Sequence, residues 1–304
     1  MKKAIVTGGA GFAGCNLVEE LLKNEYNVLC VLRPASPHNE RLHKLKAGQG
    51  SALKTLWLME LDMSELRALP ELLETGTYSD WAGATFFHLA WTGGRDDFEA
   101  QYANVDVAVA AAEAAKECGC RRIVITGSQA EYGIKSGLTA EDSLPEPFSA
   151  YGVAKAAAMY LTKRKAEMLG LEWVWGRIFS LYGKYEPEKT MLRYLIDKLK
   201  CRESPELSSC RQNWDYLDAT DGARAIIALG ERGRSGEIYN IAHGDYRPLR
   251  EFVETVHGKV GIDVPILYRD KGQEPLVSLQ PSVEKIKRDT GWKPEVEFPD
   301  GLEI

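Results

Sequence analysis

The stretch that decides the fold lies near the start of the chain: Lys3-Ala4-Ile5-Val6-Thr7-Gly8-Gly9-Ala10-Gly11-Phe12-Ala13-Gly14. Its first five residues form the short apolar run of a buried strand, and a helical apolar pattern with Leu17, Val18 and Leu21 follows the glycines. Glycines between a strand and a helix let the backbone turn tightly and approach a pyrophosphate, whose oxygens meet the first N–H groups of the helix. The stretch therefore predicts a dinucleotide site formed by Gly8, Gly11, Phe12, Ala13 and Gly14, with an ordinary tight turn as the alternative.

Composition narrows the class of protein. The chain has 304 residues, 44% of them hydrophobic and 27% charged, and a formal net charge of −6. This charge gives no broad basic field, so we expect no nucleic-acid partner. The first 14 residues lack the features of a signal peptide, and no apolar run approaches about 18 residues, so we expect no membrane span and a cytoplasmic protein. The six cysteines lack metal-site spacing, so we expect reduced thiols and no metal.

Apolar runs and helical patterns alternate along the first part of the chain. The runs at residues 28–32, 53–61, 84–90, 122–126 and 172–178 are expected strands, and they predict an α/β fold with a Rossmann-type doubly wound parallel sheet. We expect helices at about 105–116 and 151–169. Residues 1–178 would form the dinucleotide-binding domain.

After residue 178 the alternation loosens. We expect helices at 187–200, 220–230, 250–258 and 283–290, and strands at 214–217 and 237–241. Residues 179–304 would form a smaller C-terminal α/β substrate-binding lobe, with chain crossovers between the two parts.

The end of the second strand bears on the choice of cofactor. A ribose with a free 2′-hydroxyl is usually held by an acidic residue about 20 positions after the glycines, and none stands there. Arg33 stands there instead, and its guanidinium matches a 2′-phosphate, which favours NADP over NAD. Arg33 as a solvated loop residue, or stacked on adenine, is the alternative.

The ends of the third and fourth strands supply further candidate cofactor residues. Asp62 either reaches the adenine edge or caps the helix that begins near Ser64, and Met63 lies beside it. His88 in the fourth strand is expected to be a packed core residue. Ligands lie at the carboxyl edge of a doubly wound sheet, where Leu89, Ala90 and Trp91 are expected to contact the cofactor and Thr92 the substrate.

The fifth strand leads to the candidate catalytic residues. Thr126-Gly127-Ser128-Gln129-Ala130-Glu131-Tyr132-Gly133 ends this strand, and Tyr151-Gly152-Val153-Ala154-Lys155 begins the next helix. Tyrosine and lysine at i and i+4 share one helical face. The pair is common by itself, but it becomes specific after this strand order with Ser128 at the preceding strand end. The alternative is an exposed helix pair.

These motifs together resemble the extended short-chain dehydrogenase/reductase family, in its NAD(P)-dependent nucleotide-sugar epimerase/dehydratase branch. The resemblance continues through Arg177-Ile178-Phe179-Ser180-Leu181-Tyr182-Gly183 and Asp215-Tyr216-Leu217 to Thr290-Gly291-Trp292-Lys293-Pro294. It implies a small-molecule substrate, namely a nucleotide sugar. It also implies a homodimer formed through the helix of Tyr151 and the alanine-rich helix before it.

The resemblance also implies a mechanism. A free phenol has a pKa near 10, so Tyr151 would act as a base only if the Lys155 ammonium stabilised its phenolate. Lys155 would also bind the nicotinamide ribose, Thr126 would contact the cofactor, and Ser128 would hold the substrate oxygen. A proton would then move through Tyr151 while a hydride passes between a sugar carbon and nicotinamide C4.

Three functions remain open at this level. The dehydratases place carboxylates where this chain has Gln129 and Ala130, so 4,6-dehydration is disfavoured. The leading interpretation is a 4-keto-sugar reductase that uses NADPH, and the first alternative is a nucleotide-sugar C4 epimerase with tightly bound NAD. The second alternative is a non-catalytic NADP-binding sensor or structural member.

The substrate lobe departs from the family pattern. Ser180 stands where an asparagine is expected, Trp214 stands where an arginine is expected, and residues 274–278 offer no late arginine. Arg193 and Arg211 are candidate replacements for the phosphate-binding arginines, because a guanidinium binds a diphosphate in a bidentate manner. Gln129, Ser180 and Trp214 complete the expected substrate site.

Overall fold

The computed structural model describes residues 2–48, 55–76, 80–269 and 277–304. Its centre is a seven-stranded parallel sheet in the order β11-β6-β5-β4-β1-β2-β3. The strands are β1 (Lys3–Thr7), β2 (Asn27–Leu32), β3 (Leu56–Glu60), β4 (Thr85–His88), β5 (Arg122–Ser128), β6 (Glu172–Ile178) and β11 (Glu237–Ile241). This order reverses direction between β1 and β4, so the predicted Rossmann-type fold is confirmed.

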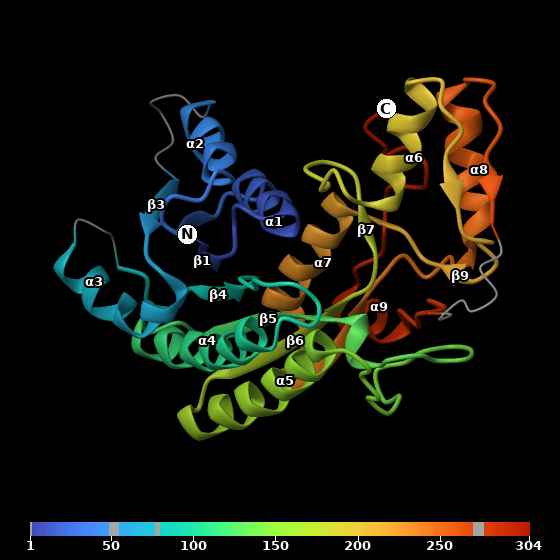
Figure 1. The fold of residues 1–304 in the computed structure, drawn as a ribbon. Helices are drawn as coiled ribbons and strands as arrows, with labels where there is room; N and C mark the ends of the chain where they lie inside the picture. The colour runs from blue at the N-terminus through green and yellow to red at the C-terminus, as the bar shows by residue number, and fades with distance from the viewer. Residues whose placement is uncertain (1, 49–54, 77–79, 270–276) are drawn as a thin grey trace.

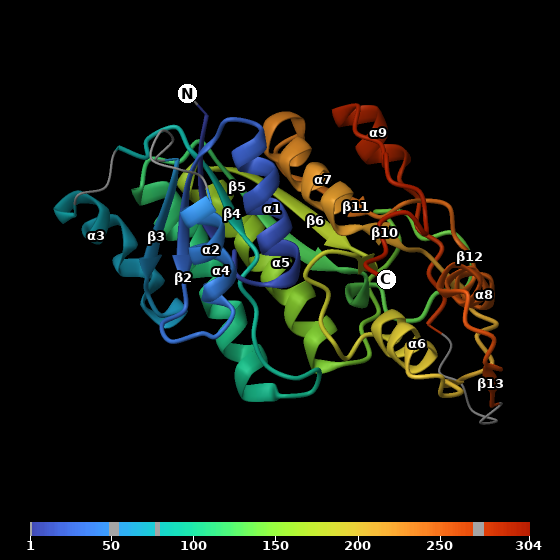
Figure 2. The ribbon, with the colours of Figure 1, turned by 90° about the horizontal axis from the view of Figure 1, so that it is seen from above.

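Helices cover both faces of the sheet (Figures 1 and 2). One face carries α1 (Phe12–Lys23) and α7 (Ala219–Arg232), and the other carries α4 (Phe98–Glu117) and α5 (Ala150–Leu169). Between β2 and β4 lie α2 (Asn39–Gly48), the 3-10 helix η1 (Met63–Ala68) and α3 (Leu69–Thr75), and η2 (Gln129–Glu131) follows β5. Among the described residues, no helix is long and apolar enough to cross a membrane.

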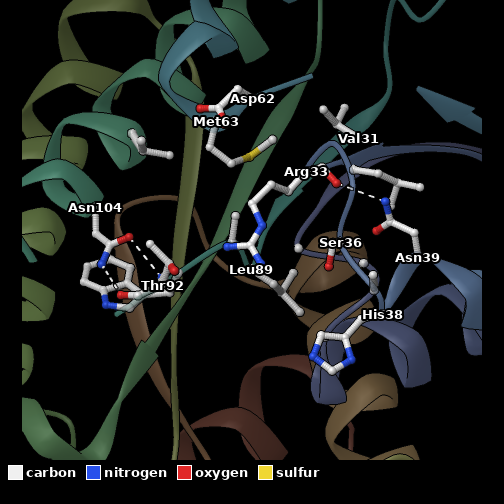
Figure 3. Close-up of a pocket in the computed structure, with 18 of the residues that line it drawn as sticks. Val31, Arg33, Ser36, His38, Asn39, Asp62, Met63, Leu89, Thr92 and Asn104 are labelled. Atoms are coloured by element: carbon white, nitrogen blue, oxygen red, sulfur yellow. Dashed lines mark hydrogen bonds between the residues drawn. The ribbon is translucent and has the colours of Figure 1, made fainter. Parts of the chain in front are cut away.

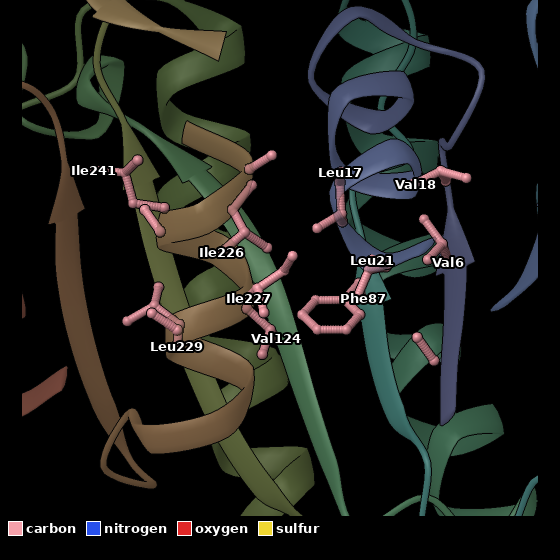
Figure 4. Packing of buried hydrophobic residues seen from close by; sticks show 14 of the residues in the cluster. Val6, Leu17, Val18, Leu21, Phe87, Val124, Ile226, Ile227, Leu229 and Ile241 are labelled. Carbon is pink, nitrogen blue, oxygen red and sulfur yellow. The ribbon is translucent and has the colours of Figure 1, made fainter. Parts of the chain in front are cut away.

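The strands are buried on both faces, and this explains their continuous apolar runs. Phe86 and Phe87 are neighbours in β4, and each is fully buried in a different cluster. Successive strand residues point to opposite faces, so each helical layer receives one of the two rings. Figure 4 shows Phe87 between Leu21 of α1 and Ile227 of α7.

A smaller layer lies beyond the carboxyl ends of the strands. It contains α6 (Met191–Lys200) and α8 (Leu249–Val260), with the short strands β7 (Leu181–Tyr182), β8 (Glu206–Leu207), β9 (Asn213–Trp214), β10 (Leu217–Asp218), β12 (Arg247–Pro248) and β13 (Leu267–Tyr268). The last helix, α9 (Glu284–Thr290), packs instead against α7 and β11 of the large sheet. The apolar cluster of the smaller layer is centred on α6, α8 and the rings of Tyr182, Tyr216, Phe252 and Phe298. The chain returns from this layer to the sheet through α7 and β11, as Figure 1 shows.

Several predicted boundaries were wrong for local reasons. The helix expected from 187 begins at Met191, because the Thr190 hydroxyl caps it by accepting from the Arg193 N–H. The single strand expected at 214–217 is divided into β9 and β10, because the buried Asp215 carboxylate turns away to accept the N–H groups of His243 and Gly244. The start of the strand expected at 53–61 lies outside the described residues.

Candidate active site

A cavity of about 480 Å³ opens at the carboxyl ends of β1, β2, β3 and β4, which is the predicted place for a cofactor. Most of the predicted cofactor residues line it, namely Gly8, Gly11, Arg33, Asp62, Met63, Leu89, Ala90 and Trp91. Thr92, which was assigned to the substrate, lines the same cavity and is tied to the Asn104 side chain by two hydrogen bonds. Phe12, Ala13 and Gly14 form the first turn of α1, directly after the Gly11 N-cap.

Two glycines of the turn are required by close approach. Gly8 has φ of +74°, and a Cβ there would lie 2.5 Å from the Ala90 nitrogen. A Cβ on Gly14 would lie 2.1 Å from the Gly8 carbonyl oxygen. The turn therefore packs against β4 and α1 with no room for side chains, which leaves the first N–H groups of α1 open to an anion.

The cavity is also lined by a positively charged side chain, that of Arg33. Figure 3 shows the Arg33 guanidinium extending into the pocket between Leu89 and Ser36, with His38 nearby. Asn39 fixes this loop by donating to the Arg33 carbonyl at 2.9 Å. Ser36, His38 and Asn39 were missed by the sequence reasoning, although their closeness to Arg33 in the chain was a usable signal.

Asp62 has the capping role, one of the two that the sequence left open, and its contact with adenine stays a prediction. Its carboxylate caps η1, accepting from the Ser64 N–H at 2.9 Å and from the Ser64 hydroxyl at 2.6 Å. These bonds, the hydroxyl first, hold the pKa of Asp62 below its usual value. The residue also lines the cavity beside Met63.

Ser128, Tyr151 and Lys155 meet beside this cavity. Ser128 ends β5, and Tyr151 and Lys155 lie in the first two turns of α5, which Ser149 caps. The Ser128 side chain lies close enough to the Tyr151 phenol to lower its pKa, and Ser128 Oγ also accepts from the Ala130 N–H at 3.2 Å. The Lys155 ammonium donates to the Thr126 carbonyl at 2.8 Å, so Thr126 positions the lysine.

The electrostatics of this group are governed by burial. Burial raises the pKa of Tyr151 above its usual value, and the Ser128 side chain offsets this only in part. Burial also lowers the pKa of Lys155 to about 7, against the opposing effect of Glu131. Desolvation thus outweighs the charge effects on both groups, and stabilisation of a Tyr151 phenolate by Lys155 stays a prediction.

Trp91 lies between the cavity and the catalytic group. The Lys155 Nζ is 3.7 Å from the centroid of its indole, and the Tyr151 ring meets it edge-on at 6.0 Å. The indole N–H donates to Gln101 Oε1 at 2.9 Å. A predicted cofactor residue is thus also in direct contact with both catalytic side chains.

Glu131 is the carboxylate nearest in sequence to Ser128, and it is fully buried. Its side chain accepts from the Ser128 N–H at 2.8 Å, from Trp175 Nε1 at 3.0 Å and from Arg177 Nε at 2.7 Å. With every one of these bonds formed inside the protein, it holds the Ser128 turn rather than serving a substrate as acid or base. His88 is also buried, hydrogen-bonded to the Thr7 hydroxyl at 2.8 Å, and burial lowers its pKa to about 3.

The predicted substrate residues are only partly brought together. Trp214 Nε1 donates to Ser180 Oγ at 3.1 Å, and Ser180 lies two residues beyond Ile178, the register partner of Ser128. Gln129 begins η2 next to Ser128. Arg193 instead donates to the Glu303 carbonyl at 3.1 Å, and Arg211 lies exposed in the loop before β9. Most of the region around 274–278 lies outside the described residues.

Arg247 is a further candidate for the substrate site, and the sequence did not indicate it. It lies directly opposite Trp214 in the antiparallel pair of β9 and β12. Directly opposed residues project from the same face, so its side chain belongs to the face of Trp214. Its guanidinium lies over the Phe252 ring at 4.4 Å, and its Nε is buried with no hydrogen-bond partner in the described structure. This pairing depends on register, for which the sequence carries no signal.

The described residues contain no group of three or more His, Cys, Asp and Glu side chains placed to hold a metal ion. All six cysteines are free thiols. The site therefore consists of a cavity at the glycine turn and a serine, tyrosine and lysine group, joined through the Trp91 indole.

Comparison with known proteins agrees with this geometry. Residues 4–242 match the NAD dependent epimerase/dehydratase family. An uncharacterised UDP-glucose epimerase of Bacillus subtilis is 25% identical over 99% of this chain and 95% of its own length.

Two solved structures have the same fold. The UDP-glucuronic acid 4-epimerase of Bacillus cereus, in complex with NAD, has 24% identity and a TM-score of 0.83, covering 98% of this chain and 95% of its own. The dTDP-glucose 4,6-dehydratase of Streptomyces venezuelae, with NAD bound, has 25% identity and a TM-score of 0.81, covering 98% and 94%.

Replacing Glu131 with Gln should destabilise the protein, because Arg177 would remain buried without its counter-ion. We expect the free energy of unfolding, measured by urea denaturation, to fall by about 3–5 kcal/mol. The double variant Glu131→Gln, Arg177→Met should lose less than Glu131→Gln alone. As a control, Glu146→Gln removes the exposed partner of Lys135 and should cost at most about 1 kcal/mol. Equal losses of unfolding free energy in Glu131→Gln and Glu146→Gln would contradict the role assigned to Glu131.

Proposed function

The chain belongs to the NAD-dependent epimerase/dehydratase family, and we propose that within this family it is a nucleotide-sugar 4-keto reductase that uses NADPH. The observation that carries this proposal is the Arg33 guanidinium inside the cavity, beside Leu89 and Ser36. A guanidinium matches a 2′-phosphate. A reductant must also leave and be replaced after every turnover, which suits NADPH.

The residues of the cavity fit a dinucleotide. The side-chain-free turn at Gly8, Gly11 and Gly14 would hold the pyrophosphate at the α1 N-terminus. Arg33 and Ser36 would hold a 2′-phosphate, while Asp62 and Met63 lie beside the adenine end. The nicotinamide of a bound dinucleotide would supply the hydride.

The chain's own residues then handle the substrate oxygen and its proton. Ser128 would hold the carbonyl oxygen of the keto sugar, and Tyr151 would donate its phenolic proton to that oxygen. Burial keeps the pKa of Tyr151 above its usual value, so the phenol is protonated at neutral pH. A protonated phenol is the form that a reduction requires, whereas oxidation of an alcohol in the first step of an epimerase requires the phenolate.

Dehydration finds little support in these side chains. The two residues after Ser128 are an amide and a methyl group, at Gln129 and Ala130. The remaining carboxylate, Glu131, is fully buried and holds the Ser128 turn. Elimination of water needs an additional acid and base near the sugar.

The second candidate is a nucleotide-sugar C4 epimerase, because the Bacillus subtilis relative that spans almost the whole chain carries an epimerase name. An epimerase keeps its cofactor bound and returns the hydride to the opposite face of the ketone. It would use the same Ser128, Tyr151 and Lys155 group.

The faces of α4 and α5 that point away from the sheet support a homodimer. Tyr102 on α4 is 71% exposed, and Tyr160 and Leu161 on α5 are 60% and 52% exposed. Exposed apolar side chains gathered on adjacent helices are typical of an interface. We therefore propose a second copy of this chain as the macromolecular partner.

Cofactor content and turnover test the proposed function together. The purified protein should carry little NAD by mass spectrometry and should consume NADPH with a 4-keto-6-deoxy nucleotide sugar. Tyr151→Phe should reduce kcat at least about 100-fold and leave NADPH binding intact, because only the proton donor is removed. Stoichiometric bound NAD with interconversion of C4 epimers would favour the epimerase, and an unchanged biological function of Tyr151→Phe would favour a non-catalytic sensor.

Arg33→Ala tests the choice of cofactor. Loss of the guanidinium should raise the KM for NADPH by about tenfold or more and leave that for NADH nearly unchanged, because NADH has no 2′-phosphate. Steady-state kinetics with both cofactors gives the ratio. His38→Ala is a matched control in the same loop, with a smaller expected effect. Equal losses for both cofactors would mean that Arg33 stacks on adenine.

We propose that Arg247, which lies opposite Trp214 and has a buried Nε without a partner among the described residues, binds the substrate diphosphate, and Arg247→Ala tests this role. The KM for the nucleotide sugar should rise about tenfold with little change in kcat, because a uniformly binding cation is removed. Arg193→Ala should stay close to the parent protein, since its guanidinium donates to the Glu303 carbonyl. A larger effect of Arg211→Ala than of Arg247→Ala would assign the diphosphate contact to Arg211.

A further inference from the structure

Trp91 holds three side chains of the site in one arrangement. Its indole face lies 3.7 Å from the Lys155 Nζ, its ring meets Tyr151 edge-on, and its N–H donates to Gln101. Gln101 is itself 2% exposed and donates through Nε2 to the Gly94 carbonyl at 2.9 Å. Because Gly94 fixes which end of the amide faces Trp91, the indole has a single hydrogen-bonded orientation.

The Lys155 ammonium needs such a contact. It is 3% exposed and has three N–H donors. One donor is taken by the Thr126 carbonyl, and the indole face covers another side of the ammonium. One donor is left for a ligand, which corresponds to the hydrogen bond that a ribose hydroxyl would accept.

We propose that Trp91 is a positioning residue, whose indole face holds the Lys155 ammonium charged and in place for the dinucleotide. The attraction arises between the cation and the negative face of the aromatic ring, and it is strongest where water is excluded. This role rests on the proposed function, because it serves the same tyrosine and lysine chemistry. The proposed role is different from contact with the cofactor, because the Trp91–Lys155 contact forms between side chains of the protein itself.

Other charged groups near Lys155 do not replace the indole. Glu131, on η2, favours the ammonium, but Arg177 shares its carboxylate. His88, on β4, is neutral at physiological pH because burial lowers its pKa to about 3. Tyr151, on the same helix, stays a neutral phenol because burial raises its pKa. Desolvation therefore lowers the pKa of Lys155 to about 7. Of the groups around the ammonium, the Trp91 indole is the one whose face lies directly against it, at 3.7 Å.

The sign of the expected shift follows from the charge. Lys155 is an ammonium below its pKa, so loss of a contact that favours the ammonium must lower that pKa. A cation–π contact at a buried site is comparable to about one pKa unit. Trp91→Phe keeps an aromatic face and should shift the pKa of Lys155 by less than about half a unit.

The experiment is a pH titration of the protein labelled with ¹³C-lysine, followed by NMR at the side-chain Cε. Lys155→Met identifies the resonance by its loss. In Trp91→Leu the Lys155 midpoint should fall by about one unit, while Trp57→Leu, in β3, should leave it unchanged. Trp91→Met serves the same purpose if Trp91→Leu fails to fold. An unchanged or raised midpoint would overturn the proposal, since it would mean that water compensates the ammonium better than the indole.

A second measurement follows NADPH binding by fluorescence across the same pH range. Affinity should weaken as pH rises through the Lys155 midpoint, and in Trp91→Leu this loss should begin about one unit lower. Identical pH profiles in the parent protein and Trp91→Leu would also overturn the proposal. The lysine titration needs neither cofactor nor substrate. A shifted lysine in a protein that binds no NADPH would therefore support the Trp91 contact and contradict the proposed function.

Discussion

The site depends on the buried ion pair between the Glu131 carboxylate and Arg177. The carboxylate joins the Ser128 N–H to Trp175 and Arg177 of the neighbouring strand β6. Removing a charge pair from water is costly, and the cost is offset only when the geometry and the surrounding hydrogen bonds are complete. Ser128 is therefore placed by an ion pair that lies behind it, together with the capped turn η2 that follows it.

Burial governs the electrostatics of the site more than neighbouring charges do. Burial shifts the pKa values of Tyr151 and Lys155 in the directions that favour their neutral forms. Their spacing on one helical face suggests instead that each would stabilise the charged form of the other. Spacing places two side chains on one face of a helix, but it contains no information about how much water reaches them. The direction of these shifts became apparent only from the packing of Trp91 and the end of β5.

The parts of the fold that were predictable are those with strong local signals. The glycine turn, the apolar runs of β1 and β2, and the tyrosine and lysine of α5 each carry a pattern that few other structures satisfy. The smaller layer beyond the sheet was harder to predict from the sequence, because its strands are two residues long and their pairing depends on tertiary contacts. The opposition of Arg247 and Trp214 is of this kind, and so is the turn at Asp215.

The position of β11 has a consequence for biosynthesis. β6 is paired on one side with β5 and on the other with β11. Residues 179–236 separate β6 from β11 in the chain, so β11 is translated later. Until Glu237–Ile241 leaves the ribosome, β6 presents an open row of amide and carbonyl groups that invites pairing with other nascent chains. Translation of the intervening residues takes on the order of several seconds. The nascent sheet therefore keeps an open edge at β6 until β11 is added.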